Sequence, residues 1–99
     1  MNNMNLDPKA VKIFRKLARK DKKIIERIRK VYFENELDDF DFENYYDEIV
    51  KIIKKNVKSM PAKELIEYWE DCYDMDFEIV PKKTLKTLTE KEREIINEN

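Results

Sequence analysis

The chain has 99 residues, of which 41% are hydrophobic, 11% aromatic and 43% charged. This size and composition suit one folded domain, spanning 1–99, with a single hydrophobic core. The sequence contains no histidine and no glycine, which excludes a Ser-His-Asp triad, a zincin motif, a P-loop and a glycine-rich dinucleotide-binding turn. We therefore expect a protein that is not an enzyme, with no catalytic residues, no cofactor and no metal site.

The apolar runs of the sequence are short. None approaches the length of a membrane span or the apolar core of a signal peptide, so we expect a cytoplasmic protein that does not enter a membrane. Cys72 is the only cysteine, which excludes an internal disulfide and a cysteine-based zinc site.

The first helical signal is Asp7 followed by Pro8. Aspartate caps free N–H groups, and proline at the first helical position loses no hydrogen bond. Apolar residues then recur at spacings of three and four. Asp21 interrupts this apolar stripe, so it either caps a second helix or marks a polar position within one long helix. We favour the break, which predicts helices over 8–20 and 22–34.

The next segment, 34–41, is acidic and has no helical periodicity. It ends in Asp41, a suitable cap for a helix with a strong apolar stripe over 42–58. Pro61 interrupts that helix, because the residue before a proline disfavours the helical region. We expect the next helix over 61–73 to pack antiparallel to the previous one.

The apolar stripe of this fourth helix includes Trp69 and Cys72, and we expect both in the core. Apolar and acidic residues then alternate with a period of two, which predicts a short extended segment at 75–80. Thr89 and Glu92 have capping-box spacing, which indicates a final helix over 89–97. The sequence as a whole predicts an all-α fold, a small bundle of four to five helices.

The charges are sorted along the chain. Residues 1–31 carry eleven bases against three acids, whereas 32–50 carry eight acids and no base. On a helix, the N-terminal bases would form one ridge opposite the apolar stripe. Such a ridge is typical of a solvated face, or of a surface for nucleic-acid phosphates, an anionic membrane or an acidic protein.

The acids near the end of the fourth predicted helix lie where the helix dipole already presents negative charge. These acids are Glu67, Glu70, Asp71 and Asp74. Such a group requires a cation, which the chain's own basic N-terminal helices, a partner or a metal could supply. In the third predicted helix, by contrast, acids precede bases, and the dipole explains that order.

Aromatic residues are more numerous than the apolar stripes can bury, so we expect some of them on the surface among acids. We therefore predict a non-enzymatic protein–protein interaction module, a small inhibitor or regulator of the mobile-element or toxin–antitoxin type, which binds a partner with a basic surface. Its acidic-aromatic surface comprises Glu36, Asp38, Asp39, Phe40, Asp41, Glu67, Glu70, Asp71, Tyr73 and Asp74.

The alternative is a nucleic-acid-binding module that uses the basic ridge on phosphates. The ridge residues are Lys12, Lys16, Arg19, Lys23, Arg27 and Lys30. A homodimer is a third arrangement, because the ridge of one copy could pack against the acidic patch of another.

Overall fold

The computed structural model describes residues 7–39 and 46–97. These residues form six α-helices and one 3₁₀ helix and contain no strand, so the predicted all-α class is confirmed. The elements are α1 (Pro8–Lys20), α2 (Lys22–Asp38), α3 (Tyr46–Lys58), α4 (Ala62–Cys72), η2 (Phe77–Ile79), α5 (Lys82–Leu85) and α6 (Glu90–Asn97).

The predicted break at Asp21 separates α1 from α2. Asp7 caps α1 by accepting from the Lys9 N–H at 2.9 Å, and Asp21 caps α2 by accepting from the Lys23 N–H at 3.0 Å. The backbone of Asp21 is extended, which turns the chain into a new direction. Its second carboxylate oxygen accepts from the Thr84 hydroxyl at 2.5 Å, so Asp21 also holds α5 in place.

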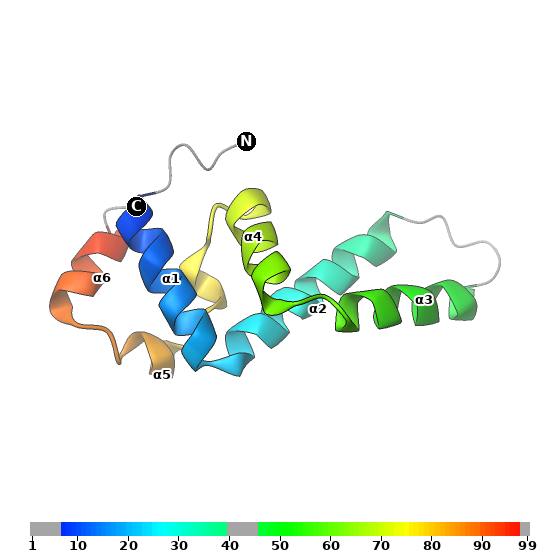
Figure 1. Ribbon diagram of the computed structural model, residues 1–99, viewed down its shortest axis with the longest axis horizontal. Coiled ribbons are helices and arrows are strands. Elements are labelled where there is room, and N and C mark those ends of the chain that lie inside the picture. The colour runs from blue at the N-terminus through cyan, green and yellow to red at the C-terminus, as the bar shows by residue number, and fades with distance from the viewer. Residues whose placement is uncertain (1–6, 40–45, 98–99) are drawn as a thin grey trace.

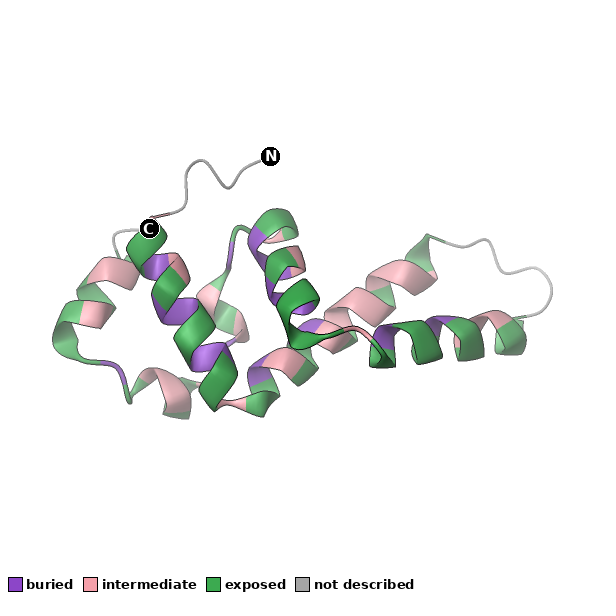
Figure 2. Cartoon of the chain, in the orientation of Figure 1, coloured by how far each residue is buried: buried purple, intermediate pink, exposed green. Residues whose placement is uncertain are grey.

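The core lies where α1, α4 and the first half of α2 meet (Figures 1 and 2). Its largest fully buried side chains are Phe14, Leu17, Ile24, Ile28 and Leu65. Each contributes about 1.5–3 kcal/mol relative to exposure in water. The ring of Phe77 packs edge-on against Phe14 at 5.4 Å, which brings η2 onto this core.

Helix α2 continues to Asp38, four residues past its predicted end at residue 34. The prediction that 34–41 has no helix is therefore wrong for residues 34–38. Tertiary contacts explain the extension. The Asn35 side-chain amide donates to the hydroxyls of Tyr68 and Tyr73 at 2.6 and 2.7 Å, and Tyr32 packs edge-on against Tyr68. These bonds hold the second half of α2 against α4.

Helices α2 and α3 lie side by side and run in opposite directions (Figure 1). The predicted start of α3, 42–45, and its cap Asp41 lie outside the described residues. The expectation that α3 packs antiparallel to α4 is wrong, because both helices pack mainly on α2. We call α3 and the facing half of α2, residues 29–38, the arm; it projects from the rest of the fold.

The prediction of an extended segment at 75–80 is also wrong, because residues Phe77–Ile79 form the 3₁₀ helix η2. Asp74 and Met75 both have positive φ angles, 51° and 56°, which turn the chain sharply after α4. A left-handed backbone conformation costs about 1–2 kcal/mol for each non-glycine residue. Two interactions offset this cost: Met75 is buried, and the Trp69 indole N–H donates to the Asp76 carbonyl at 2.8 Å. The chain then forms η2, and the short helix α5 that follows was not predicted.

We expect Asp21→Ala to lower the free energy of unfolding by about 1–2 kcal/mol at neutral pH, the usual effect of losing a helix cap. Hydrogen bonds from Thr84 and from the Lys23 N–H lower the pKa of Asp21 in the folded state. Its contribution is therefore complete above about pH 4, the ordinary aspartate range, and is lost as the pH falls through the lower folded pKa.

Urea unfolding at neutral and at strongly acidic pH measures this dependence. The matched control is Asp38→Ala, which removes an exposed carboxylate from the other end of α2 and should change stability by less than about 0.5 kcal/mol. A loss for Asp21→Ala that is the same at both pH values would contradict the prediction.

Candidate functional site

The acids of α4 include one that the fold neutralises internally. Glu70 is only 5% exposed, and the guanidinium of Arg15 on α1 donates to both of its oxygens, at 2.9 and 3.0 Å. This bidentate bond raises the pKa of Arg15, and Glu67 adds a smaller effect. Of the three cation sources considered for these acids, pairing within the chain therefore holds for Glu70, whose carboxylate is buried rather than exposed on the surface of α4.

The other predicted acidic-aromatic residues are distributed over two helices. Glu36 is half-buried on α2, and Asp38 and Asp39 are exposed at its end. Glu67, Asp71 and Asp74 are exposed on or just after α4, while the Tyr73 ring is half-buried and stacks on Trp69 at 4.2 Å. Phe40 and Asp41 lie outside the described residues.

Cys72, which we expected in the core, is exposed, whereas Trp69 is buried as predicted. The buried face of α4 is centred between the Leu65–Trp69 row and the Ile66–Glu70 row. Because Arg15 neutralises Glu70, that carboxylate can occupy the core side of the helix. Cys72 is the last residue of α4 and is exposed there.

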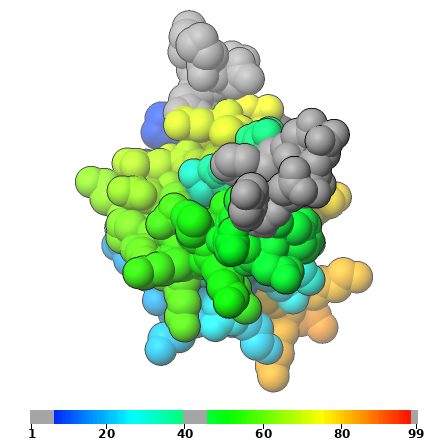
Figure 3. Space-filling view, turned by 90° about the vertical axis from the view of Figure 1, so that its right-hand side faces the viewer, coloured from blue at the N-terminus to red at the C-terminus, as the bar shows by residue number. Residues whose placement is uncertain are grey.

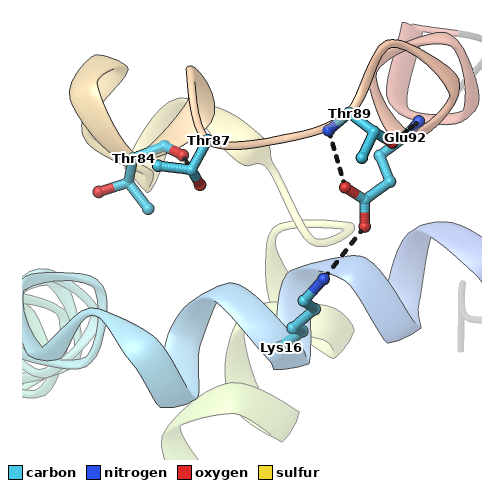
Figure 4. A network of polar contacts seen from close by, with 5 residues as sticks. All are labelled: Lys16, Thr84, Thr87, Thr89 and Glu92. Carbon is cyan, nitrogen blue, oxygen red and sulfur yellow. Dashed lines mark hydrogen bonds and ion pairs between the residues drawn. The ribbon is translucent and has the colours of Figure 1, made fainter.

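The six residues of the basic ridge do not form one line, because α1 and α2 run in different directions (Figure 1). Two of them are bonded within the fold. Lys16 pairs with Glu92 at 3.4 Å, where Glu92 also accepts from the Thr89 N–H in the predicted capping box (Figure 4). Arg27 donates to the Ile79 carbonyl at 3.0 Å. Lys12, Arg19, Lys23 and Lys30 are exposed.

A groove of about 430 Å³ runs between the two helices of the arm and the start of α4. We call it the arm groove; its lining residues are Tyr32, Glu36, Ile49, Ile52, Ile53, Asn56, Val57, Met60 and Glu64. Its floor is apolar. The lining residues, all within the described part of the chain, include the carboxylates of Glu36 and Glu64 and no lysine or arginine, so the groove carries negative charge.

The tyrosines beside the arm groove stay neutral near pH 7. Burial raises the pKa of Tyr32, and the carboxylates of Glu36 and Glu64 raise it further. Burial likewise raises the pKa of the neighbouring Tyr68 to about 12. The charge of the groove therefore comes from Glu36 and Glu64 rather than from tyrosinate.

A second pocket of about 350 Å³, which we call the basic pocket, is also formed between α2 and α3. Its lining residues are Glu26, Arg29, Lys30, Phe33, Lys54, Val57 and Lys58. Arg29 serves the fold, because its Nη1 lies 2.6–3.2 Å from the carbonyl oxygens of Val57, Lys58 and Met60, at the end of α3. Figure 3 looks onto the molecule from the side where the arm ends, and α3 (green) faces the viewer there.

Of the residues proposed from the sequence, Glu36 lines the arm groove and Lys30 lines the basic pocket, but the sequence pattern did not point to the apolar residues of the arm groove. The available signal was Ile52, which stands off the apolar stripe of α3 among lysines and is 60% exposed. Glu64 and Met60 could not be placed there without knowing that α4 starts beside α3.

Comparison with protein-family models, curated proteins and solved structures finds no significant match to this chain. Within 7–39 and 46–97, no group of three or more histidine, cysteine, aspartate or glutamate side chains is placed to hold a metal ion. The helices in these ranges are also too short or too polar to cross a membrane.

We expect Arg15→Ala to lower the free energy of unfolding by about 1–3 kcal/mol, because it leaves the buried Glu70 carboxylate without its donor. The matched control is Arg19→Ala, which removes an exposed arginine from the same helix. Replacing both partners, as Arg15→Ala with Glu70→Leu, should recover part of the loss because no charge is then buried. Chemical denaturation measures all three; equal losses for Arg15→Ala and Arg19→Ala would contradict the pairing.

Proposed function

We propose that the chain is a non-enzymatic protein-binding module, a small inhibitor or regulator, that binds a basic amphipathic segment of its partner in the arm groove. The observation that carries this proposal is Ile52, a large aliphatic side chain left mostly in water beside an apolar groove. An exposed aliphatic residue continuous with such a groove is typical of a protein-binding surface.

The chemistry of the groove selects the partner. Ile49, Ile52 and Met60 offer apolar contacts along the trough between α2, α3 and α4. A helix lying in such a trough would place its own apolar residues, spaced by three and four, against these side chains. Glu36 and Glu64 would then attract lysines or arginines at the edges of that helix and repel an acidic one.

A synthetic amphipathic helix with leucines on one face and lysines on the other is a direct probe. We expect it to bind, measured by isothermal titration calorimetry, and its glutamate-substituted counterpart not to bind. Ile52→Glu should weaken binding by at least about tenfold, because it places a carboxylate in the apolar contact. Glu36→Gln and Glu64→Gln should each weaken binding less, by an amount that shrinks in high salt.

Lys55→Glu is the matched control, since it introduces glutamate at an exposed position of the same helix that does not line the groove. It should leave peptide affinity unchanged or slightly increased. The proposal fails if both peptides bind equally, if neither binds, or if Ile52→Glu and Lys55→Glu have the same effect.

The second candidate function is binding of single-stranded nucleic acid at the basic pocket. Lys30, Lys54 and Lys58 come together there from two helices, and Glu26 is the single acid among the described residues that line the pocket. The half-exposed ring of Phe33 lies among them. Lysines that follow a phosphate backbone and a ring on which a base can stack are typical of single-strand binding.

Fluorescence anisotropy with a labelled RNA or DNA oligonucleotide, titrated between about 50 and 200 mM salt, tests this candidate. Replacing Lys54 and Lys58 with glutamine should reduce the salt dependence of the binding constant by about one to two in the log–log slope. The comparison is the same change at Lys12 and Arg19 of the predicted ridge. Equal effects of the two pairs, or no binding at the lowest salt, would reject the basic pocket.

A further inference from the structure

A third cavity lies at the opposite end of the molecule from the arm, between η2, α5 and α6 (Figure 1). Its volume is about 740 Å³, within the range of small-molecule sites. We call it the end cavity; its lining residues are Asp76, Phe77, Glu78, Val80, Lys82, Leu85, Lys86, Leu88, Arg93, Ile96 and Asn97.

The floor of the end cavity is apolar and held in place by the fold. Val80 and Leu88 are buried, and Phe77 is fixed by its edge-on contact with Phe14. Backbone bonds from the Val80 N–H to the Phe77 carbonyl and from the Leu88 N–H to the Leu85 carbonyl, at 3.0 and 3.1 Å, close the turns that carry them. A ligand would therefore find this apolar surface already formed.

The cations that line the end cavity come from α5, its C-cap and α6. Lys82 and Lys86 are four residues apart at α5, which places them on the same face of that turn. Arg93 of α6 donates from Nη2 to the Lys86 carbonyl at 3.0 Å, so its guanidinium lies beside the end of α5. The acids that line the cavity come from a different element: Glu78 is on η2, and the carboxylate of Asp76, its N-cap, accepts from the Glu78 N–H at 2.9 Å.

We propose that the end cavity binds small amphiphilic anions, with an unbranched apolar chain against its floor and a carboxylate against Arg93 and Lys86. Arginine and lysine side chains donate charge-assisted hydrogen bonds to a carboxylate. Burial of the unbranched chain against the apolar floor removes its surface from water. The site is separate from the arm groove, so it stands or falls independently of the protein-binding proposal.

Decanoate, kept below its micelle concentration, is the probe, and decyltrimethylammonium has the same chain with the opposite charge. We expect decanoate to bind in calorimetry and to shift backbone amide resonances of residues 76–97 in ¹⁵N-correlation spectra. The cationic amphiphile should bind at least about tenfold more weakly.

Arg93→Gln should weaken decanoate binding by at least about fivefold, because the carboxylate loses its charged donor. Lys91→Gln is the matched control: it removes an exposed cation from the same helix that does not line the cavity. Lys86→Gln supplies a second test that leaves the Arg93 bond to the backbone carbonyl intact.

The proposal is overturned if decanoate does not bind, if the two amphiphiles bind equally, or if the shifted resonances lie outside the end cavity. Equal effects of Arg93→Gln and Lys91→Gln would also overturn it. An acidic amphipathic peptide is the final comparison. If it displaces decanoate and binds more tightly, the cavity is a docking surface for an acidic protein segment rather than a small-molecule site.

Discussion

Both oxygens of the Asp21 carboxylate accept hydrogen bonds, one from the Lys23 N–H and the other from the Thr84 hydroxyl. The first bond caps α2 and lets the chain change direction after α1. One continuous helix could not bring Ile24 and Ile28 against the same core as Phe14 and also lead the chain away from that core. Because the direction changes at Asp21, the first half of α2 closes the core and its second half leaves it to form the arm. The second bond ties α5, and with it one wall of the end cavity, to this junction.

The fold uses part of its N-terminal positive charge internally. Arg15 neutralises Glu70, Arg29 occupies the carbonyl groups at the end of α3, and Lys16 reaches Glu92. Each of these contacts joins segments far apart in the sequence, so it fixes the position of one helix relative to another. An exposed pair such as Lys16–Glu92 adds little to the free energy of unfolding. Within the arm, the described lining residues separate the charges, with acids in the arm groove and mainly bases in the basic pocket.

The parts of the fold that depend on local chemistry could be predicted from the sequence. Asp7, Asp21 and the Thr89–Glu92 capping box each act within three residues, and all three mark helix starts in the structure. The predictions that were wrong concern segments whose conformation depends on contacts between residues far apart in the sequence. Helix α2 continues past residue 34 because Asn35 meets two tyrosines of the α4 region, and the turn at Met75 depends on burial of that side chain. The arm groove needed the pairing of α3 with α2, which no local pattern specifies.

The two charged surfaces of the arm are separated by little more than one side chain, since Val57 lines both. A twofold dimer centred on the arm groove would bring Glu36 and Glu64 of one copy toward the same carboxylates of the other, and like charges oppose that contact. The groove of one copy against the basic pocket of the next would match charges, but that contact is heterologous and leaves an unpaired surface on each terminal copy. A single basic helix from a different protein, the partner that we propose for the arm groove, would meet the charge of the groove without either cost. Under that proposal, a different protein matches the charge pattern of the arm better than a second copy does.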